Sequence, residues 1–208
     1  MEEKIKIILV GRTRSGKSTA IKVLTDVKHV ANAGTIFFRT KQPENTTLIC
    51  PKKMILDICD TPGLFEISEK NEPRNNDTLL DLIKPQAQIA DFIFVTISFD
   101  AGFNDQDIES LMIFMKLFGK ENVKILLTRS ENSDSGERTN WINSLNLHPI
   151  IKYCGLKFEL DKNIFFLGSN TLDYDQKNSQ QIDFINANIK KMRNSLLKFF
   201  YSYIETKK

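Results

Sequence analysis

The sequence is organised around the stretch Gly11-Arg12-Thr13-Arg14-Ser15-Gly16-Lys17-Ser18, which fits the pattern G-x-x-x-x-G-K-[ST]. An apolar strand precedes it and a helix is expected to begin near Ser18, which is the context that this phosphate-binding motif requires. Its glycines permit a tight loop whose backbone N–H groups point inward at phosphate oxygens, and the helix N-terminus adds partial positive charge. We expect Lys17 to reach the β- and γ-phosphates and the Ser18 hydroxyl to bind Mg²⁺. The nucleotide contacts predicted for this loop are Arg12, Thr13, Arg14, Ser15, Gly16, Lys17, Ser18 and Thr19.

A second phosphate motif follows the next apolar strand. Asp57-Ile58-Cys59-Asp60-Thr61-Pro62-Gly63 begins within the strand-like run MILDIC and continues past its end, which should lie beside the phosphate loop. The acid Asp60 would hold Mg²⁺ through water, and the Gly63 N–H can approach the γ-phosphate because no side chain blocks it. Asp-Thr-Pro-Gly after an apolar strand is typical of GTPases of the translation-factor class. An ordinary Pro-Gly turn is the alternative, but the two motifs together are far more specific than either alone.

Strand-like and helix-like segments alternate along the chain. Strands are expected at 4–10, at two places within 35–60, and at 91–98, 123–128 and 164–167. Helices are expected at 18–24, from an N-cap at Asn104 to Phe118 with Gly119 as the stop, and at about 180–203. The alternation predicts a three-layer α/β fold of the P-loop, Ras-like type, with a mainly parallel six-stranded sheet and an extra C-terminal helix.

No long linker divides the chain, so we expect a single domain over 1–208, with a GTPase core at 4–170 and a C-terminal helix at 178–204. The stretches 61–77 and 130–138 are rich in Asn, Ser, Glu and Pro, and are candidate mobile loops. The helix at 104–118 is apolar on more than one face, which fits either burial on both sides or a subunit contact.

The composition of the 208 residues, 41% apolar and 26% charged, is ordinary for a soluble globular protein and excludes collagen or a disulfide-stapled miniprotein. A net charge of +3 is too mild to demand a nucleic-acid partner. The three cysteines form no C-x-x-C pair, so a structural zinc site is not expected. No run of 18 apolar residues is present, and a cytoplasmic location is expected. The basic last helix leaves peripheral contact with an intracellular membrane open, beside packing on the core.

A base-binding site is expected after the strand that ends at Thr128. A GTPase needs a carboxylate that accepts hydrogen bonds from guanine N1–H and the 2-amino group, and its usual carrier is Asn-Lys-x-Asp. Here Thr128-Arg129-x-Glu131 occupies that place. Arg129 can stack along the base and Glu131 can accept both guanine protons, whereas adenine would leave the buried carboxylate short of a partner. An exposed charged loop is the alternative reading of these residues, and an adenine-nucleotide kinase is the rival function.

This variant resembles the fourth motif of the immunity-associated GTPases, the AIG or GIMAP type, a branch of the septin- and chloroplast-import-like GTPases. Their motif reads Thr-Arg/His-x-Glu-Asp, and Asn132 is the departure here. Their third motif, Asp-Thr-Pro-Gly-Leu-Phe, is matched over 60–65. Their box Arg-Phe/Tyr-Thr-x-x-Asp precedes a helix ending in Phe-Gly and is matched in part over 102–107, with Gly102 in place of Arg. The resemblance covers roughly 4–204.

The resemblance implies GTP or GDP with Mg²⁺ as ligands, and a homodimer or GTP-dependent oligomer. It also implies that Ser169 and Asn170, after the last strand, line the base pocket. Family members carry a Val-Thr-Lys threonine before a long strand, which contacts Mg²⁺ and the γ-phosphate. Thr40 lies at the matching distance from both phosphate motifs, with Thr35 as the runner-up and a plain strand residue as the alternative. The predicted metal ligands are thus Ser18, Thr40 and Asp60.

Two departures bear on catalysis. Ras-type enzymes place a Gln after Asp-x-x-Gly to orient water, whereas this chain has Leu64, as the family does, so slow hydrolysis is expected. Arg14 stands where the family phosphate loop usually has Gly, a position at which guanylate-binding proteins carry an internal arginine finger. We expect Arg14 to fold over the phosphates, with a solvated loop charge as the alternative. The predicted catalytic residues are Lys17, Arg14 and Thr40. A GTP-loaded scaffold that barely hydrolyses and acts through assembly is the alternative function, favoured by Leu64 and Gly102.

Overall fold

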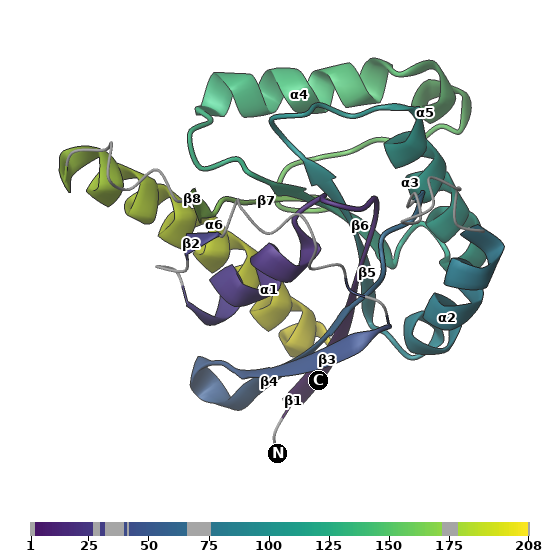
Figure 1. Ribbon diagram of the computed structural model, residues 1–208, viewed down its shortest axis with the longest axis horizontal. Coiled ribbons are helices and arrows are strands. Elements are labelled where there is room, and N and C mark those ends of the chain that lie inside the picture. The colour runs from purple at the N-terminus through teal and green to yellow at the C-terminus, as the bar shows by residue number, and fades with distance from the viewer. Residues whose placement is uncertain are drawn as a thin grey trace.

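The computed structural model describes residues 3–26, 30–31, 40, 42–65, 76–171 and 179–207 (Figure 1). Its strands are β1 (Glu3–Val10), β2 (Val30–Ala31), β3 (Glu44–Ile49), β4 (Met54–Asp60), β5 (Phe92–Ser98), β6 (Val123–Thr128), β7 (Ile164–Leu167) and β8 (Asn170–Thr171). Its helices are α1 (Lys17–Thr25), α2 (Asn76–Gln88), α3 (Asp105–Phe118), α4 (Ser135–Leu147), α5 (Pro149–Tyr153) and α6 (Ser179–Thr206), with a 3₁₀ turn, η1 (Pro51–Lys53). The predicted alternation of strands and helices is confirmed.

The main sheet has six strands in the order β3-β4-β1-β5-β6-β7. β3 runs antiparallel to β4 and every other neighbouring pair is parallel, while β2 and β8 form a separate parallel pair. Every residue of β5 and β6 is buried, as expected for parallel strands covered on both faces. The register pairs Leu9 with Asp60 and Ser98 with Thr128. The carboxyl ends of β1, β4 and β6 therefore meet at one edge, which is where open α/β sheets bind ligands.

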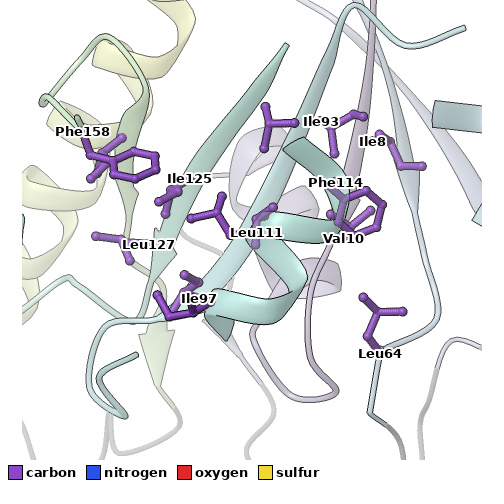
Figure 2. Packing of buried hydrophobic residues seen from close by; sticks show 14 of the residues in the cluster. Ile8, Val10, Leu64, Ile93, Ile97, Leu111, Phe114, Ile125, Leu127 and Phe158 are labelled. Atoms are coloured by element: carbon purple, nitrogen blue, oxygen red, sulfur yellow. The ribbon is translucent and has the colours of Figure 1, made fainter. Parts of the chain in front are cut away.

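Helices cover both faces of this sheet, which gives the predicted three layers (Figure 1). On one face, α3 turns Leu111 and Phe114 toward the strands, over Val10 and its neighbours (Figure 2). On the other face, α1 and α6 share a second cluster that includes Leu24 and Phe200. Full burial of one such side chain contributes about 1.5–3 kcal/mol, so the two clusters hold the strands that carry the site.

The C-terminal helix α6 packs along the second face. Ile189, Leu196 and Phe200 are buried against the sheet, and the Arg193 guanidinium donates through Nε to the Leu24 carbonyl at the end of α1, at 2.8 Å. Packing on the core, one of the two roles considered for this helix, accounts for its apolar stripe. Within the described parts of the chain, no helix is both long enough and apolar enough to cross a membrane.

Three helices, α2, α4 and α5, lie where the sequence analysis predicted either a loop or no element at all. α4 begins at Ser135, so the prediction of a mobile loop over 130–138 is wrong for its second half. Its first turn is closed by a capping box, in which the Asp134 carboxylate accepts from the Glu137 N–H at 2.8 Å and the Glu137 carboxylate accepts from the Asp134 N–H at 2.9 Å. α2 begins at Asn76, inside the other predicted loop, whose residues 66–75 lie outside the described residues.

Candidate functional site

Two glycines allow the phosphate loop to turn between β1 and α1. Gly16 precedes α1 with a left-handed φ of 91°, and a Cβ there would lie 2.9 Å from Thr128 Oγ1. Gly11 has a φ of 134°, and a Cβ there would lie 2.5 Å from the carbonyl oxygen of Thr96. The Thr128 hydroxyl donates to the Ser15 carbonyl at 2.6 Å and so fixes the loop on the end of β6. A side chain at either glycine would push the loop off the sheet.

The predicted phosphate-binding lysine is buried in this loop. Lys17 is 6% exposed, and its Nζ donates to the carbonyl oxygens of Gly11 at 3.1 Å and Arg12 at 2.9 Å. A buried ammonium needs such acceptors because its desolvation is costly. The positive charge is therefore held inside the loop that the sequence predicts to bind phosphate.

The two arginines of the loop lie in different surroundings. Arg12 turns toward α3, where its Nε donates to Asp107 Oδ1 at 2.7 Å. Asp107 is 1% exposed, and its other oxygen accepts from the Asn104 N–H at 3.1 Å to close the capping box that begins α3. Arg14 is exposed, and its φ of 67° places a residue with a side chain in the left-handed region. Arg12 is thus the anchored arginine of the loop and Arg14 the exposed one.

The three predicted metal ligands lie together. Asp60 Oδ2 accepts hydrogen bonds from the hydroxyls of Ser18 at 2.5 Å and Thr40 at 3.1 Å, and the two hydroxyl oxygens are 3.5 Å apart. Asp60 Oδ1 is buried and finds no hydrogen-bond partner among the described residues. Such an oxygen is costly unless a cation or water completes the site. Because Mg²⁺ prefers oxygen ligands of this kind, these residues fit a magnesium ion.

The segment after β4 pairs with the phosphate loop. The Leu64 N–H donates to the Gly11 carbonyl at 3.0 Å, and the Thr13 N–H donates to the Leu64 carbonyl at 3.4 Å. Gly63 packs so closely on Thr13 that a Cβ would lie 2.5 Å from the Thr13 nitrogen. The Leu64 side chain is 1% exposed and belongs to the core (Figure 2). Gly63 is therefore required by close packing, and Leu64 turns away from the solvent side of the loop.

Glu131, in the loop that follows β6, lies buried against the loop that follows β7. It is 4% exposed, and its Oε2 accepts from the Ser169 N–H at 3.1 Å. Gly168 approaches so closely that a Cβ there would lie 2.7 Å from Glu131 Cα. Arg129 is exposed, and one of its guanidinium nitrogens lies 3.5 Å from the Arg14 carbonyl oxygen. The loop after β6 thus presents a held carboxylate and an exposed guanidinium beside the phosphate loop.

Two ionisable groups near these loops have shifted pKa values. Burial, followed by the neighbouring negative charge of Asp60, raises the pKa of the Cys59 thiol to about 11. Cys59 is therefore neutral at physiological pH and supplies no thiolate beside the predicted metal ligands. Burial also raises the pKa of Asp100, while the positive charge of Arg129 acts in the opposite direction. Asp100 thus places an exposed acid near Arg129 of the loop after β6.

The predicted site residues gather at the carboxyl edge of the sheet, with some differences in detail. Thr128 was expected at the base, but its hydroxyl bonds to the phosphate loop. Asn170 is described only in its backbone, at the start of β8. Thr35 lies outside the described residues, whereas Thr40 is placed beside the other metal ligands. Sequence reasoning missed the contact of Asp107 with the loop, although this residue ends the family box and could have been found there.

A comparison of the sequence with protein-family models gives a match to the AIG1 family over residues 5–203. The chain belongs to the AIG1 family. The match takes in the phosphate loop, the predicted metal ligands and the loops after β6 and β7, so the family resemblance stated from the motifs is confirmed. No curated protein sequence matches this AIG1-family chain.

Solved structures of G domains share the fold of this AIG1-family chain. The bacterial selenocysteine-specific elongation factor EF-Sec superposes with a TM-score of 0.58 at 17% identity, over 96% of this chain and 29% of the factor. Era, solved with MgGDPNP and a segment of 16S ribosomal RNA, gives 0.58 at 17% identity, over 90% of this chain and 57% of Era. Toc33 from Arabidopsis thaliana gives 0.54 at 16% identity, over 93% and 84%. The AIG1-family chain therefore has a G-domain fold, and it spans less than two thirds of the elongation factor and of Era.

Proposed function

We propose that this chain binds GTP and GDP with Mg²⁺ and hydrolyses GTP slowly to GDP, as a nucleotide-dependent switch. One observation carries the proposal: the buried Lys17, the hydroxyl cluster on Asp60 and the held carboxylate of Glu131 meet at one edge of the sheet. Each of them suits a different part of one ligand, namely the phosphates, the metal ion and the base. Membership of the AIG1 family supports the assignment of a GTP-binding G domain.

Glu131 is the residue that would select guanine. Because the Ser169 N–H already holds one carboxylate oxygen, the orientation of the group is set before the base arrives. Guanine N1–H and its 2-amino group are adjacent donors that a carboxylate can accept together, and adenine lacks this pair. A buried acceptor left without its donors discriminates strongly between ligands. Arg129 would stack along the base, and Ser169 and Asn170 would line the pocket.

The phosphates and the metal would occupy the loop and the hydroxyl cluster. Lys17 would contact the β- and γ-phosphates, while Ser18, Thr40 and Asp60 would hold Mg²⁺, which neutralises phosphate charge when bound. Thr40 and Gly63 belong to the two segments that a γ-phosphate would hold in place. Loss of that phosphate would release both segments, and this release is the proposed switch.

Hydrolysis is proposed to be slow because the residue after Gly63 cannot form a hydrogen bond that would orient the attacking water molecule. Leu64 is apolar and buried in the core, so it neither orients water nor stabilises charge. Arg14 is the group proposed to assist, by folding over the phosphates in cis. It is exposed, whereas Arg12 is held by Asp107. An arginine finger raises the hydrolysis rate by roughly 10³–10⁵.

Competition binding tests the assignment of the base. GDP and ADP would displace a fluorescent GDP analogue from the wild type and from Glu131→Gln, with the exposed Glu109→Gln as the control. We expect the wild type to prefer GDP over ADP by roughly a hundredfold or more, and the Glu131 variant to lose most of this preference. Equal binding of ADP and GDP by the wild type would overturn the proposal and favour an adenine-nucleotide enzyme.

A second candidate function is a GTP-loaded scaffold that acts through self-association. Buried Leu64, and Gly102 in place of the family Arg, favour it. The Toc33 structure is that of a dimerization-deficient mutant, and assembly of the present chain remains a proposal. Light scattering with GTP and with GDP, run beside multiple-turnover phosphate release, separates the two functions. GTP-dependent scattering without phosphate release supports the scaffold, whereas phosphate release without scattering supports the enzyme.

The proposed cellular setting is the cytoplasm, with contact at the surface of an intracellular membrane as an addition to it. Basic side chains on the exposed side of α6 are the candidate membrane contact, namely Lys190, Lys191 and Lys198. Sedimentation with anionic and with neutral vesicles tests this contact, since an electrostatic attachment requires the anionic lipid and weakens with salt.

A further inference from the structure

Two side chains of α6 contact the loops that form the base site. Asn188 Nδ2 donates to the backbone carbonyl of Glu131 at 3.2 Å. The Met192 sulfur accepts from the Ser130 hydroxyl at 3.6 Å and from the Gly168 N–H at 3.2 Å. Because Asn188 and Met192 are four residues apart on a helix, they lie on the same face. One face of α6 is thus bonded to the loop after β6 and to the loop after β7.

The contacts of Met192 with the two loops are buried from solvent. Met192 is 5% exposed and Ser130 is fully buried, and Gly168 is buried as well. A buried backbone N–H needs an acceptor, and the thioether sulfur, though a weak acceptor, supplies one to Gly168. The same glycine has no room for a Cβ against Glu131. The loops after β6 and β7 are therefore packed closely against each other at Glu131 and Gly168, and both loops also bond to Met192.

We propose that Asn188 and Met192 are positioning residues for guanine selectivity. They fix the distance between the two base loops, and through it the place of the Glu131 carboxylate. This inference rests on the proposed function, in which that carboxylate accepts from the base. Neither side chain touches the nucleotide in this scheme, and both act through Glu131. The C-terminal helix is then a working part of the base pocket as well as a cover of the sheet.

A ratio of two affinities isolates this effect. IDP differs from GDP in lacking the 2-amino group, so it engages a correctly placed carboxylate through one donor, while GDP engages it through two. A shifted carboxylate loses the benefit of the second donor, because hydrogen bonds weaken steeply as their geometry worsens. The ratio of GDP to IDP affinity therefore falls when Glu131 moves. Uniform damage to the fold lowers both affinities together and leaves the ratio unchanged.

The experiment measures this ratio by competition in the full chain. Met192→Leu keeps the side-chain volume and removes the sulfur acceptor, and Asn188→Ala removes the donor at a partly exposed position. Ser195→Ala is the matched control, since it removes another side-chain hydrogen bond of α6, to Asp161, away from the base loops. Glu131→Gln gives the reference for a lost carboxylate, and thermal unfolding of each variant reports the fold.

We expect the ratio to fall roughly threefold to tenfold in Met192→Leu and in Asn188→Ala, in line with the worth of one hydrogen bond. Ser195→Ala should keep the wild-type ratio. The inference is overturned if both variants keep the ratio while Glu131→Gln loses it, or if GDP and IDP affinities fall in parallel. A wild type without any preference for GDP would instead overturn the guanine assignment, and this inference with it.

Discussion

Arg12 of the phosphate loop and Asp107 of α3 form an ion pair in which Nε and Oδ1 are 2.7 Å apart. The same carboxylate closes the capping box of α3 through the Asn104 N–H. One side chain thus joins two segments that are 95 residues apart in the sequence. The position of the phosphate loop depends on the start of α3 through this contact.

Replacing Asp107 by Ala should therefore lower the free energy of unfolding by about 2–3 kcal/mol, since charge-assisted hydrogen bonds are lost on both sides of a buried carboxylate. Urea unfolding measures this change. Asp105→Ala is the matched control, because Asp105 is an exposed acid in the same helical turn, and it should cost less than about 1 kcal/mol. Equal losses in the two variants would show that the buried contacts of Asp107 contribute nothing specific.

Arg14 gives a prediction in which stability and activity move in opposite directions. Its φ of 67° is a left-handed conformation, which costs a residue with a side chain roughly 1–2 kcal/mol and costs Gly little. Arg14→Gly should therefore raise the free energy of unfolding, and Arg14→Ala should not. Both variants should lose roughly 10³-fold or more in single-turnover GTP hydrolysis if the guanidinium is an arginine finger. Unchanged hydrolysis at unchanged GTP affinity would remove that role.

Removal of the metal should act through Asp60. We expect EDTA to accelerate GDP dissociation from the wild type by roughly tenfold or more, because a bound metal ion contributes several kcal/mol of charge stabilisation. Asp60→Asn should dissociate quickly and respond little to EDTA. The control is Asp57→Asn on the same strand, where Lys4 pairs with the carboxylate at 2.9 Å. A wild-type response to EDTA in the Asp60 variant would place the metal elsewhere.

The contacts of Asp91 with the end of α6 should make the free energy of unfolding depend on pH in the acid range. Burial raises the pKa of Asp91, but hydrogen bonds from Lys207, the Lys6 N–H and Tyr203 outweigh it and hold this pKa below its ordinary value. A lowered carboxyl pKa contributes stability above its unfolded value, near 4, and this stability disappears as the pH falls through the folded value. Urea midpoints between about pH 6 and pH 3 should therefore fall less steeply in Asp91→Asn than in the wild type.

The control for this titration is Asp81→Asn, since Asp81 is an exposed acid paired with Lys84 on α2. Surface pairs of this kind contribute little to stability. Asp81→Asn should thus follow the wild-type acid profile. An unchanged profile in Asp91→Asn would mean that the tether at the end of α6 carries no acid-sensitive stability.

Much of the fold follows from local patterns in the sequence. The strands at 123–128 and 164–167 have the predicted bounds because short apolar runs flanked by polar residues leave little choice of limits. α3 begins after Asn104 and ends before Gly119 as its capping chemistry indicated. All of α4 was missed, because the composition of 130–138 indicated a loop and the capping pair Asp134 and Glu137 was not recognised. The polar composition of 130–138 indicated a loop, whereas the capping residues Asp134 and Glu137 correctly mark the start of a helix.

The positions of the candidate site residues could be predicted where a sequence motif contains them. They were harder to predict where segments far apart in the sequence come into contact. Ser18, Thr40 and Asp60 are brought together as expected, since motif spacing fixes which side chains face the loop. The turn of Thr128 toward Ser15, and the bonds of Asn188 to the base loop, depend on packing across 113 and 57 residues. Periodicity places a helix face on the core, but it does not say which loop that face reaches.

The place of α6 in the chain bears on how the protein comes into being. A ribosome synthesises the phosphate loop up to residue 18 and the proposed metal ligand Asp60 long before it adds Met192. Until then, the loops after β6 and β7 lack the helix that bonds to them from behind. Because domains fold as units during synthesis, and because the phosphate loop itself rests on Thr128 at the end of β6, we expect the loop and the proposed base site to reach their final arrangement together. The proposed nucleotide site would then become competent only once α6 has left the exit tunnel and docked.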